Sequence, residues 1–192
     1  MSVSGSSRAE APGAPSLKPR VLSLISLIDE AFDHKAWHGT TLLGSIRGLD
    51  AATASRRPAP GRHNIWEIVV HAAYWKYAVR RRLTGEKRGS FAFAGSNWFV
   101  RPPQRAKGPA KSNVARGKSN GAAAADVADV AFRADVKLLI AEHRALRRII
   151  ASLPDAALEK RIGSVTRAFV VRGIAAHDLY HAGQIQLLKR LV

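Results

Sequence analysis

The chain has 192 residues, which is enough for one domain with a hydrophobic core and too few for two full ones. It contains no cysteine, which excludes disulfides, zinc fingers, iron–sulfur clusters and a thiolate nucleophile, so a bound metal would need imidazole and oxygen ligands. The net charge is +17, but six of the 31 basic residues lie in the acid-free segment 101–120, and we interpret the excess mainly as a solvated, Arg-rich composition rather than a polyanion site.

The N-terminal part of the chain predicts a disordered tail followed by a helix. Residues 1–19 are mostly Ser, Gly, Ala and Pro, and such a segment buries too little apolar surface to offset the entropy of ordering. From about residue 20 to Lys35, apolar residues recur at helical spacing, with Leu24 and Ile28 on one face. The helix should be interrupted at Gly39 and resume over residues 42–46.

The apolar run at residues 21–28 has the length of a signal-peptide core. Asp29 and Glu30 follow it directly, however, and no small-residue cleavage pattern is present. No stretch approaches the ~20 apolar residues that span a membrane. We therefore expect a cytoplasmic protein with no membrane partner.

The remaining periodic segments predict three longer helices and an all-α fold. The first begins at Asn64, whose side chain can cap the helix, and runs to about Leu83. The second spans about 123–152 and ends before Pro154, and the third spans about 166–191. Five apolar residues of the second helix are available for the core: Val127, Val130, Val136, Leu139 and Leu146.

The segment between the first two of these helices, from about 85 to 121, has two parts. Its first part carries Phe91, Phe93, Trp98 and Phe99 and is aromatic enough to pack on the domain. The part after Pro102 is a basic low-complexity stretch, and we predict a flexible basic insert at about 101–122.

Three histidines fall on predicted core faces. The helix at 166–191 places His177 and His181, four residues apart, on the same face as Val170, Ile174 and Leu188. The helix at 64–83 places His71 on a face with Ile68, Trp75 and Val79. Three inward imidazoles on two helices can hold one side of a metal coordination sphere.

Imidazole suits divalent transition metals such as Zn, Ni and Fe, and three neutral ligands leave positions for water or substrate. Asp178 and Gln184 flank the histidine pair and could accept a hydrogen bond from an imidazole N–H or hold a bound water. The alternative interpretation is that the histidines are hydrogen-bonded core residues. The metal interpretation is favoured because inward Tyr or Leu would pack at lower cost than three imidazoles.

The other histidines are weaker candidates. His34 and His38 form a second pair at four-residue spacing, but Gly39 disrupts the helix there, and Trp37 and His38 fit better as pocket residues. His63 and His143 are expected to face solvent. Trp75 and Tyr180 complete the set of candidate pocket residues, and Tyr180 could donate a proton or a hydrogen bond.

Two segments, RHNIWEIVVH at 62–71 and GIAAHDLYHAGQI at 173–185, resemble the two signatures of the DinB/YfiT-like metalloprotein superfamily. The segments AWHG at 36–39 and GSNWF at 95–99 resemble pieces of one DinB-like subgroup. The resemblance implies that residues 20–192 form a four-helix bundle of up-down-down-up topology. It also implies a metal triad of His71, His177 and His181.

The superfamily includes thiol transferases that use bacillithiol, mycothiol or glutathione, a thiol-dependent maleylpyruvate isomerase, and many members with no assigned activity. We therefore expect one divalent metal (Zn, Ni, Fe or Mn) and an enzyme of the transferase or hydrolase type, in which the metal activates a water or thiol. A low-molecular-weight thiol or another small molecule would be the substrate. A non-catalytic metal-binding protein of a stress response, a nucleic-acid binder acting through the basic insert, and a homodimer remain open alternatives.

Overall fold

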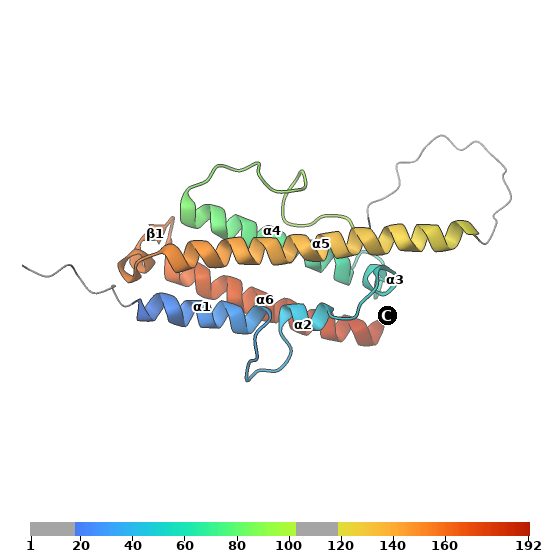
Figure 1. The fold of residues 1–192 in the computed structure, drawn as a ribbon, viewed down its shortest axis with the longest axis horizontal. Helices are drawn as coiled ribbons and strands as arrows, with labels where there is room; N and C mark the ends of the chain where they lie inside the picture. The colour runs from blue at the N-terminus through green and yellow to red at the C-terminus, as the bar shows by residue number, and fades with distance from the viewer. Residues whose placement is uncertain (1–17, 103–118) are drawn as a thin grey trace, which may run out of the picture.

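A computed structural model of the chain describes residues 18–102 and 119–192. Four long helices lie side by side in it: α1 (Pro19–Phe32), α4 (Ile65–Thr84), α5 (Ser119–Ser152) and α6 (Arg167–Leu191) (Figure 1). Helix α4 packs on α5 and α6, and α1 packs on α6 and α5. The prediction of an all-α fold is confirmed in the described residues, apart from one hairpin of two-residue strands.

Helix α1 begins with Pro19 in its first turn and buries an apolar stripe that includes Leu24 and Ile28. It ends at Phe32, three residues before the predicted end, and the chain then forms a loop that projects from the bundle (Figure 1). Beyond Gly39, which has a φ of +96°, the chain resumes in α2 (Leu42–Ile46) as predicted. Sequence periodicity did not predict α3 (Ala51–Ser55), because five residues are too few to show a repeat.

Helix α4 follows the predicted boundaries closely. The Asn64 side chain accepts a hydrogen bond from the Glu67 N–H at 2.8 Å, which confirms the predicted cap. Gly85 ends the helix in the left-handed conformation, with a φ of +77°.

Helix α5 begins at Ser119, four residues earlier than predicted, and its two halves have different surroundings. In the second half Leu139 and Leu146 are buried, as expected. Val127 and Val130 are 70% and 69% exposed, so their predicted place in the core was wrong. Figure 1 shows that the N-terminal turns of α5 extend beyond the ends of the neighbouring helices.

Between α5 and α6 the chain forms the 3-10 helix η1 (Asp155–Glu159) and two antiparallel strands, β1 (Arg161–Ile162) and β2 (Val165–Thr166). Strands of two residues show no alternation that a sequence could display. Thr166 then caps α6, because its hydroxyl oxygen accepts a hydrogen bond from the Phe169 N–H at 3.2 Å.

The segment 86–102 contains no helix or strand but packs on α4. Phe91 and Phe99 contact Tyr74 with ring centroids 5.3 and 5.6 Å apart. At the end of the segment, the Arg101 guanidinium donates to Asp135 on α5 at 2.7 Å and lies over the Phe93 ring. The aromatic part of the predicted loop therefore packs on the domain, as expected.

Two predicted flexible regions lie largely outside the described residues: the tail at 1–19, of which 1–17 are not described, and the basic insert, of which 103–118 are not described. Among the helices that are described, none is both long and apolar enough to cross a membrane.

Ion pairs link the helices of the bundle, both near its surface and in its core. The Arg147 side chain on α5 donates to both carboxylate oxygens of Asp29 on α1 at 2.8 to 3.0 Å. Lys76 on α4 forms an ion pair with Asp178 on α6, and both side chains are 1% exposed. A buried pair of this kind fixes the relative positions of the two helices, because neither charge can be left alone in the core without a large cost.

Candidate metal centre

The three predicted histidines meet between α4 and α6. The Nε2 atom of His177 lies 3.2 Å from Nε2 of His71 and 3.1 Å from Nε2 of His181. Each ring offers one nitrogen, and these three nitrogens all lie within 4.8 Å of one another. Within residues 18–102 and 119–192, no other group of histidines and carboxylates has a comparable arrangement.

Hydrogen bonds assign the tautomers of two rings. Nδ1 of His71 lies 2.9 Å from the backbone oxygen of Asn97, and Nδ1 of His181 lies 2.7 Å from the amide oxygen of Gln184. Both partners are acceptors, so each Nδ1 carries the proton and each neutral ring directs its Nε2 lone pair toward His177. A single proton on His177 Nε2 cannot serve two lone pairs well, whereas a cation can bind all three nitrogens.

The environment keeps the rings neutral. Burial lowers the pKa of His71 to about 4, and the neighbouring His181 adds to the effect. Burial likewise lowers the pKa of His177 to about 3, helped by His181 and His71, and also lowers the pKa of His181. Neutral imidazole is the form that binds metal, so at neutral pH none of the three rings carries a positive charge that must be lost first; His177 only has to carry its proton on Nδ1 instead of Nε2.

The loop at 86–102 holds His71 from the side opposite α6. The backbone oxygen of Asn97 accepts the hydrogen bond from His71. Its side-chain oxygen accepts a second hydrogen bond, from Trp75 Nε1, at 2.9 Å. Asn97 has a φ of +66°, in the left-handed region that Asn tolerates better than most residues. In this backbone conformation the Asn97 carbonyl points toward the His71 imidazole.

Trp98 lies between two imidazole rings. It stacks on His71 with centroids 3.8 Å apart and on His63 with centroids 3.6 Å apart, and both pairs are nearly parallel. His63 is held in turn by a hydrogen bond to Glu67 at 2.9 Å. His63 is exposed, as predicted, and one face of its ring is covered by Trp98.

A cavity of about 400 Å³ lies beside the triad. Its wall includes Trp75, Trp98 and Tyr180, so it is largely aromatic, and Gln184 also lines it. Gln184 Nε2 donates to the Tyr180 hydroxyl at 2.9 Å, which leaves the hydroxyl proton available to a bound molecule. Trp75 and Tyr180 thus lie at the pocket, as expected.

Three other predicted roles do not match the structure. Trp37 is fully exposed and His38 is exposed, and both lie on the projecting loop, so neither lines the pocket. Asp178 forms no hydrogen bond with an imidazole among the described residues, because its carboxylate faces Lys76 inside the bundle. His143, expected to face solvent, is 4% exposed and stacks on Phe32 with centroids 3.7 Å apart.

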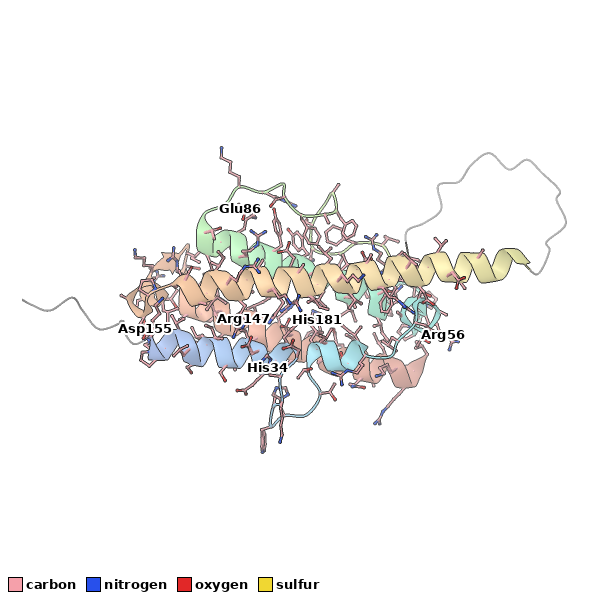
Figure 2. The ribbon with its side chains drawn as sticks, in the orientation of Figure 1. His34, Arg56, Glu86, Arg147, Asp155 and His181 are labelled. Carbon is pink, nitrogen blue, oxygen red and sulfur yellow. The ribbon has the colours of Figure 1, made fainter. Side chains whose placement is uncertain are left out.

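The rival pair of histidines does not form a site. The His34 side chain is exposed and bonds its neighbour Asp33 at 2.6 Å. Figure 2 shows His34 where the loop leaves α1, away from His181 in the middle of the bundle. The sequence had already indicated that His34 and His38 are weaker metal-ligand candidates, and their exposed position agrees with that prediction.

Asn97 and Trp98 are the site residues that helical periodicity did not reveal. They lie in a segment with no helical or strand repeat, so no pattern assigned their side chains to a face. Two signals were available: the large aromatic residues in a segment otherwise rich in Gly and Ser, and the resemblance of residues 95–99 to a DinB-like subgroup.

Comparison with known protein families shows which family this chain belongs to. The family model described as the DinB superfamily matches residues 34–185, which is most of the chain and includes all three histidines. The chain belongs to the DinB superfamily. Comparisons of this DinB protein with curated proteins and with solved structures found no match.

Proposed function

We propose that this DinB protein binds one divalent transition metal through the Nε2 atoms of His71, His177 and His181. The observation that carries the proposal is the convergence of these three atoms, with 3.2 and 3.1 Å separations from His177. Imidazole nitrogens lie about 2.0–2.1 Å from a bound Zn²⁺, and in tetrahedral or octahedral geometry such ligands are roughly 3.0–3.4 Å apart. The two separations from His177 therefore match the spacing of a ligand set, and the third pair, within 4.8 Å, would close on the ion; Zn, Ni, Fe or Mn is the ion that we propose.

We propose further that the site is catalytic, as a transferase or hydrolase. A divalent ion with three neutral ligands keeps its full charge and open positions, and it would lower the pKa of a bound water or thiol to near neutrality. Trp75 and Trp98 would shield the reacting group from bulk water. The Tyr180 hydroxyl, which accepts from Gln184, would donate a hydrogen bond to the substrate.

A thiol used at this site would come from a separate small molecule, because the chain has no cysteine. The pocket next to the triad is large enough for part of such a molecule, at about 400 Å³. A cellular low-molecular-weight thiol is the co-substrate that we propose.

A panel of thiols tests the catalytic proposal. Conjugation of 1-chloro-2,4-dinitrobenzene is measured with glutathione, mycothiol and bacillithiol, with and without a chelator. We expect one thiol to support turnover that the chelator abolishes and that metal restores. Tyr180→Phe should lower kcat while metal content stays the same, and Trp37→Phe on the projecting loop is the matched control. Full turnover in metal-free protein would contradict the proposal. Metal retention without any thiol-dependent turnover would contradict the thiol-transferase proposal and favour a hydrolase or a non-catalytic metal protein.

We also propose the up-down-down-up topology that the family resemblance implies. It is supported by the chain direction in Figure 1, where the colour gradient runs one way along α1 and α6 and the opposite way along α4 and α5. A cytoplasmic location stays a prediction from the sequence.

A further inference from the structure

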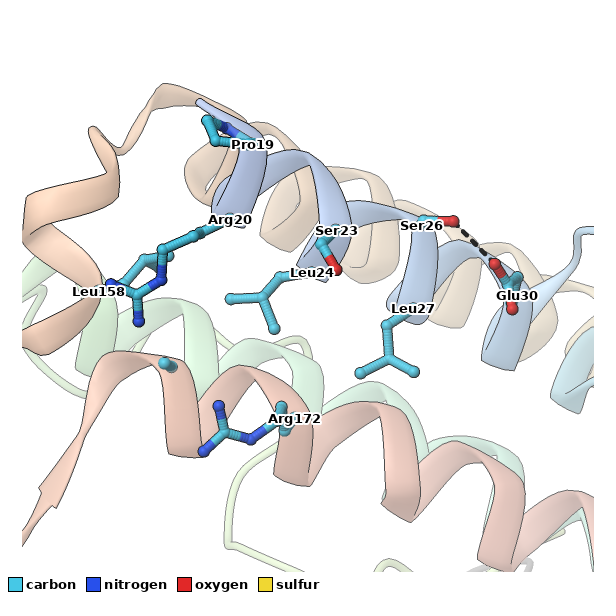
Figure 3. Close-up of a pocket in the computed structure, with 10 residues that line it drawn as sticks. Pro19, Arg20, Ser23, Leu24, Ser26, Leu27, Glu30, Leu158 and Arg172 are labelled. Atoms are coloured by element: carbon cyan, nitrogen blue, oxygen red, sulfur yellow. Dashed lines mark hydrogen bonds between the residues drawn. The ribbon is translucent and has the colours of Figure 1, made fainter. Parts of the chain in front are cut away.

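The bundle has other cavities besides the one at the triad, and they differ in the charges of the side chains that line them. One of them, about 580 Å³, lies between α1 and α6, where the side chains of Leu24 and Leu27 form an apolar floor (Figure 3). Arg20 at one end of it is paired with Glu159, and the Glu30 carboxylate lies at the other end beside Ser26. Arg172 on α6 also lines this groove, so Arg20 and Arg172 are balanced by Glu159 and Glu30, and the groove favours no particular charge.

A second groove, of about 360 Å³, lies between α2 and α5 and has charges of one sign. Its floor is apolar and comes from both helices and from the turn that follows α2, through Leu43, Ile46, Leu49, Phe132 and Val136. Phe132 and Ile46 are buried at 2% and 4% exposure and belong to the main hydrophobic core, so the floor is a fixed part of the bundle. Its volume falls within the range of about 300–1,000 Å³ that is usual for small-ligand pockets.

Three exposed cations surround this floor: Arg47, Arg133 and Lys137. None of them forms an ion pair or a side-chain hydrogen bond with another residue in the described part of the chain, and no acidic side chain lines the groove. Two carboxylates are close in the chain, those of Asp50 and Asp129, but neither lines the groove, and both face backbone N–H groups of α3. Asp50 accepts from the Thr53 N–H at 2.7 Å, and Asp129 accepts from the Ala51 N–H at 2.6 Å.

We propose that this groove is a binding site for an amphipathic organic anion, a molecule with an apolar body and a carboxylate or similar head group. The apolar body would cover Leu43, Leu49 and Val136. The head group would lie at the rim, where the Arg133 guanidinium and the Lys137 ammonium are one helical turn apart on α5 and Arg47 faces them from the end of α2. A neutral molecule of the same shape would gain the apolar contact but not the charge complementarity.

The proposed anion site is separate from the candidate metal centre. None of the residues that line this groove also lines the pocket at the triad. Loss of the histidines would therefore leave the anion site intact, and a failure of one proposal would not imply a failure of the other.

Octanoate and 1-octanol are the probes for the test, because they share a chain length and differ in charge. Backbone amide NMR shifts of the full-length protein are followed during titration with each. We expect octanoate to saturate shifts in residues 43–49 and 132–137, with 1-octanol binding at least fivefold more weakly. Arg133→Gln/Lys137→Gln should weaken octanoate at least fivefold and leave the 1-octanol affinity within twofold.

The matched control is Arg144→Gln/Arg148→Gln, which removes two exposed cations at the same spacing on the same helix outside the groove. It should change the octanoate affinity less than twofold. Shifts that do not saturate or that lie elsewhere on the bundle would overturn the proposal. An equal loss in both double variants would also overturn it, because that result would show only a response to net charge.

Discussion

Asn97 and His71 are joined by a hydrogen bond in which the backbone oxygen of Asn97 accepts the Nδ1 proton of His71 at 2.9 Å. This bond connects a segment without regular secondary structure to a candidate metal ligand on α4. It fixes the tautomer that leaves Nε2 free to bind, which is the usual role of a partner behind a ligating imidazole. The loop at 86–102 is thus part of the site rather than a simple connection.

Trp98→Ala should weaken metal binding, because the substitution removes the ring that stacks on His71 and on His63. Loss of a group that orients a metal ligand typically costs about 10- to 100-fold in affinity, and we expect the lower end of that range. Competition with a chelator of known affinity measures the change. Trp98→Phe, which keeps an aromatic face, should recover most of the affinity, and Trp37→Ala on the projecting loop should have no effect. Unchanged affinity in Trp98→Ala would show that the stack does not position His71.

Gln184→Leu should lower metal affinity about 10-fold, because it removes the acceptor of the His181 Nδ1 proton while keeping a side chain of similar size. Gln184→Glu supplies a carboxylate in the same place and should bind metal at least as tightly as the original protein. The visible absorption of bound Co²⁺ reports both the affinity and the ligand geometry. Equal affinity in the leucine and glutamate variants would contradict a positioning role for Gln184.

The sequence predicted the parts of the site that lie on regular helices. His71, His177 and His181 occupy repeating positions, and the period of 3.6 residues assigns such positions to one face of a helix. Asn97 and Trp98 could not be placed in this way, because a loop has no period. Trp37 and His38 were misplaced because nothing in the sequence indicates the direction in which the connection between α1 and α2 projects.

Burial was harder to predict for polar residues than for apolar ones. His143 lies between charged residues in the sequence and was expected at the surface, yet it is buried against Phe32 beside the ion pair of Asp29 and Arg147. Asp178 was expected to support a histidine, but it pairs with Lys76, which is 102 residues away in the chain. A local sequence pattern cannot indicate a partner that is so distant in the chain.

Lys76→Met should destabilise the protein by about 3–5 kcal/mol, because it leaves the Asp178 carboxylate buried without a counter-ion. The double variant Lys76→Met/Asp178→Leu removes both charges and should regain most of the lost free energy of unfolding. Urea denaturation of the metal-free protein measures both values. Additive losses in the double variant would show that the two side chains do not depend on each other.

His143 should make the protein less stable in acid. Burial lowers its pKa from 6.5 to about 2, with Lys76 and Arg147 adding to the effect, although the Asp29 carboxylate lies 3.7 Å away. Between these two values the unfolded chain binds a proton that the folded chain does not, so the free energy of unfolding falls as the pH falls. His143→Leu removes this effect, and relative to neutral pH the variant should lose about 2 kcal/mol less at pH 5. Parallel curves for the two proteins between pH 7 and pH 5 would contradict the assignment of a buried neutral imidazole.

The most direct test of the metal centre is the metal-to-chain ratio of protein purified without a histidine tag, incubated with Zn²⁺, Ni²⁺, Fe²⁺ or Mn²⁺, desalted and measured by elemental analysis. We predict close to one ion per chain for at least one of these metals. We also predict almost none in His177→Ala/His181→Ala. The control His34→Ala/His38→Ala removes two histidines at the same spacing from the exposed loop and should keep the full ratio. Full metal retention in His177→Ala/His181→Ala, or no retained metal in the original protein, would contradict the metal centre.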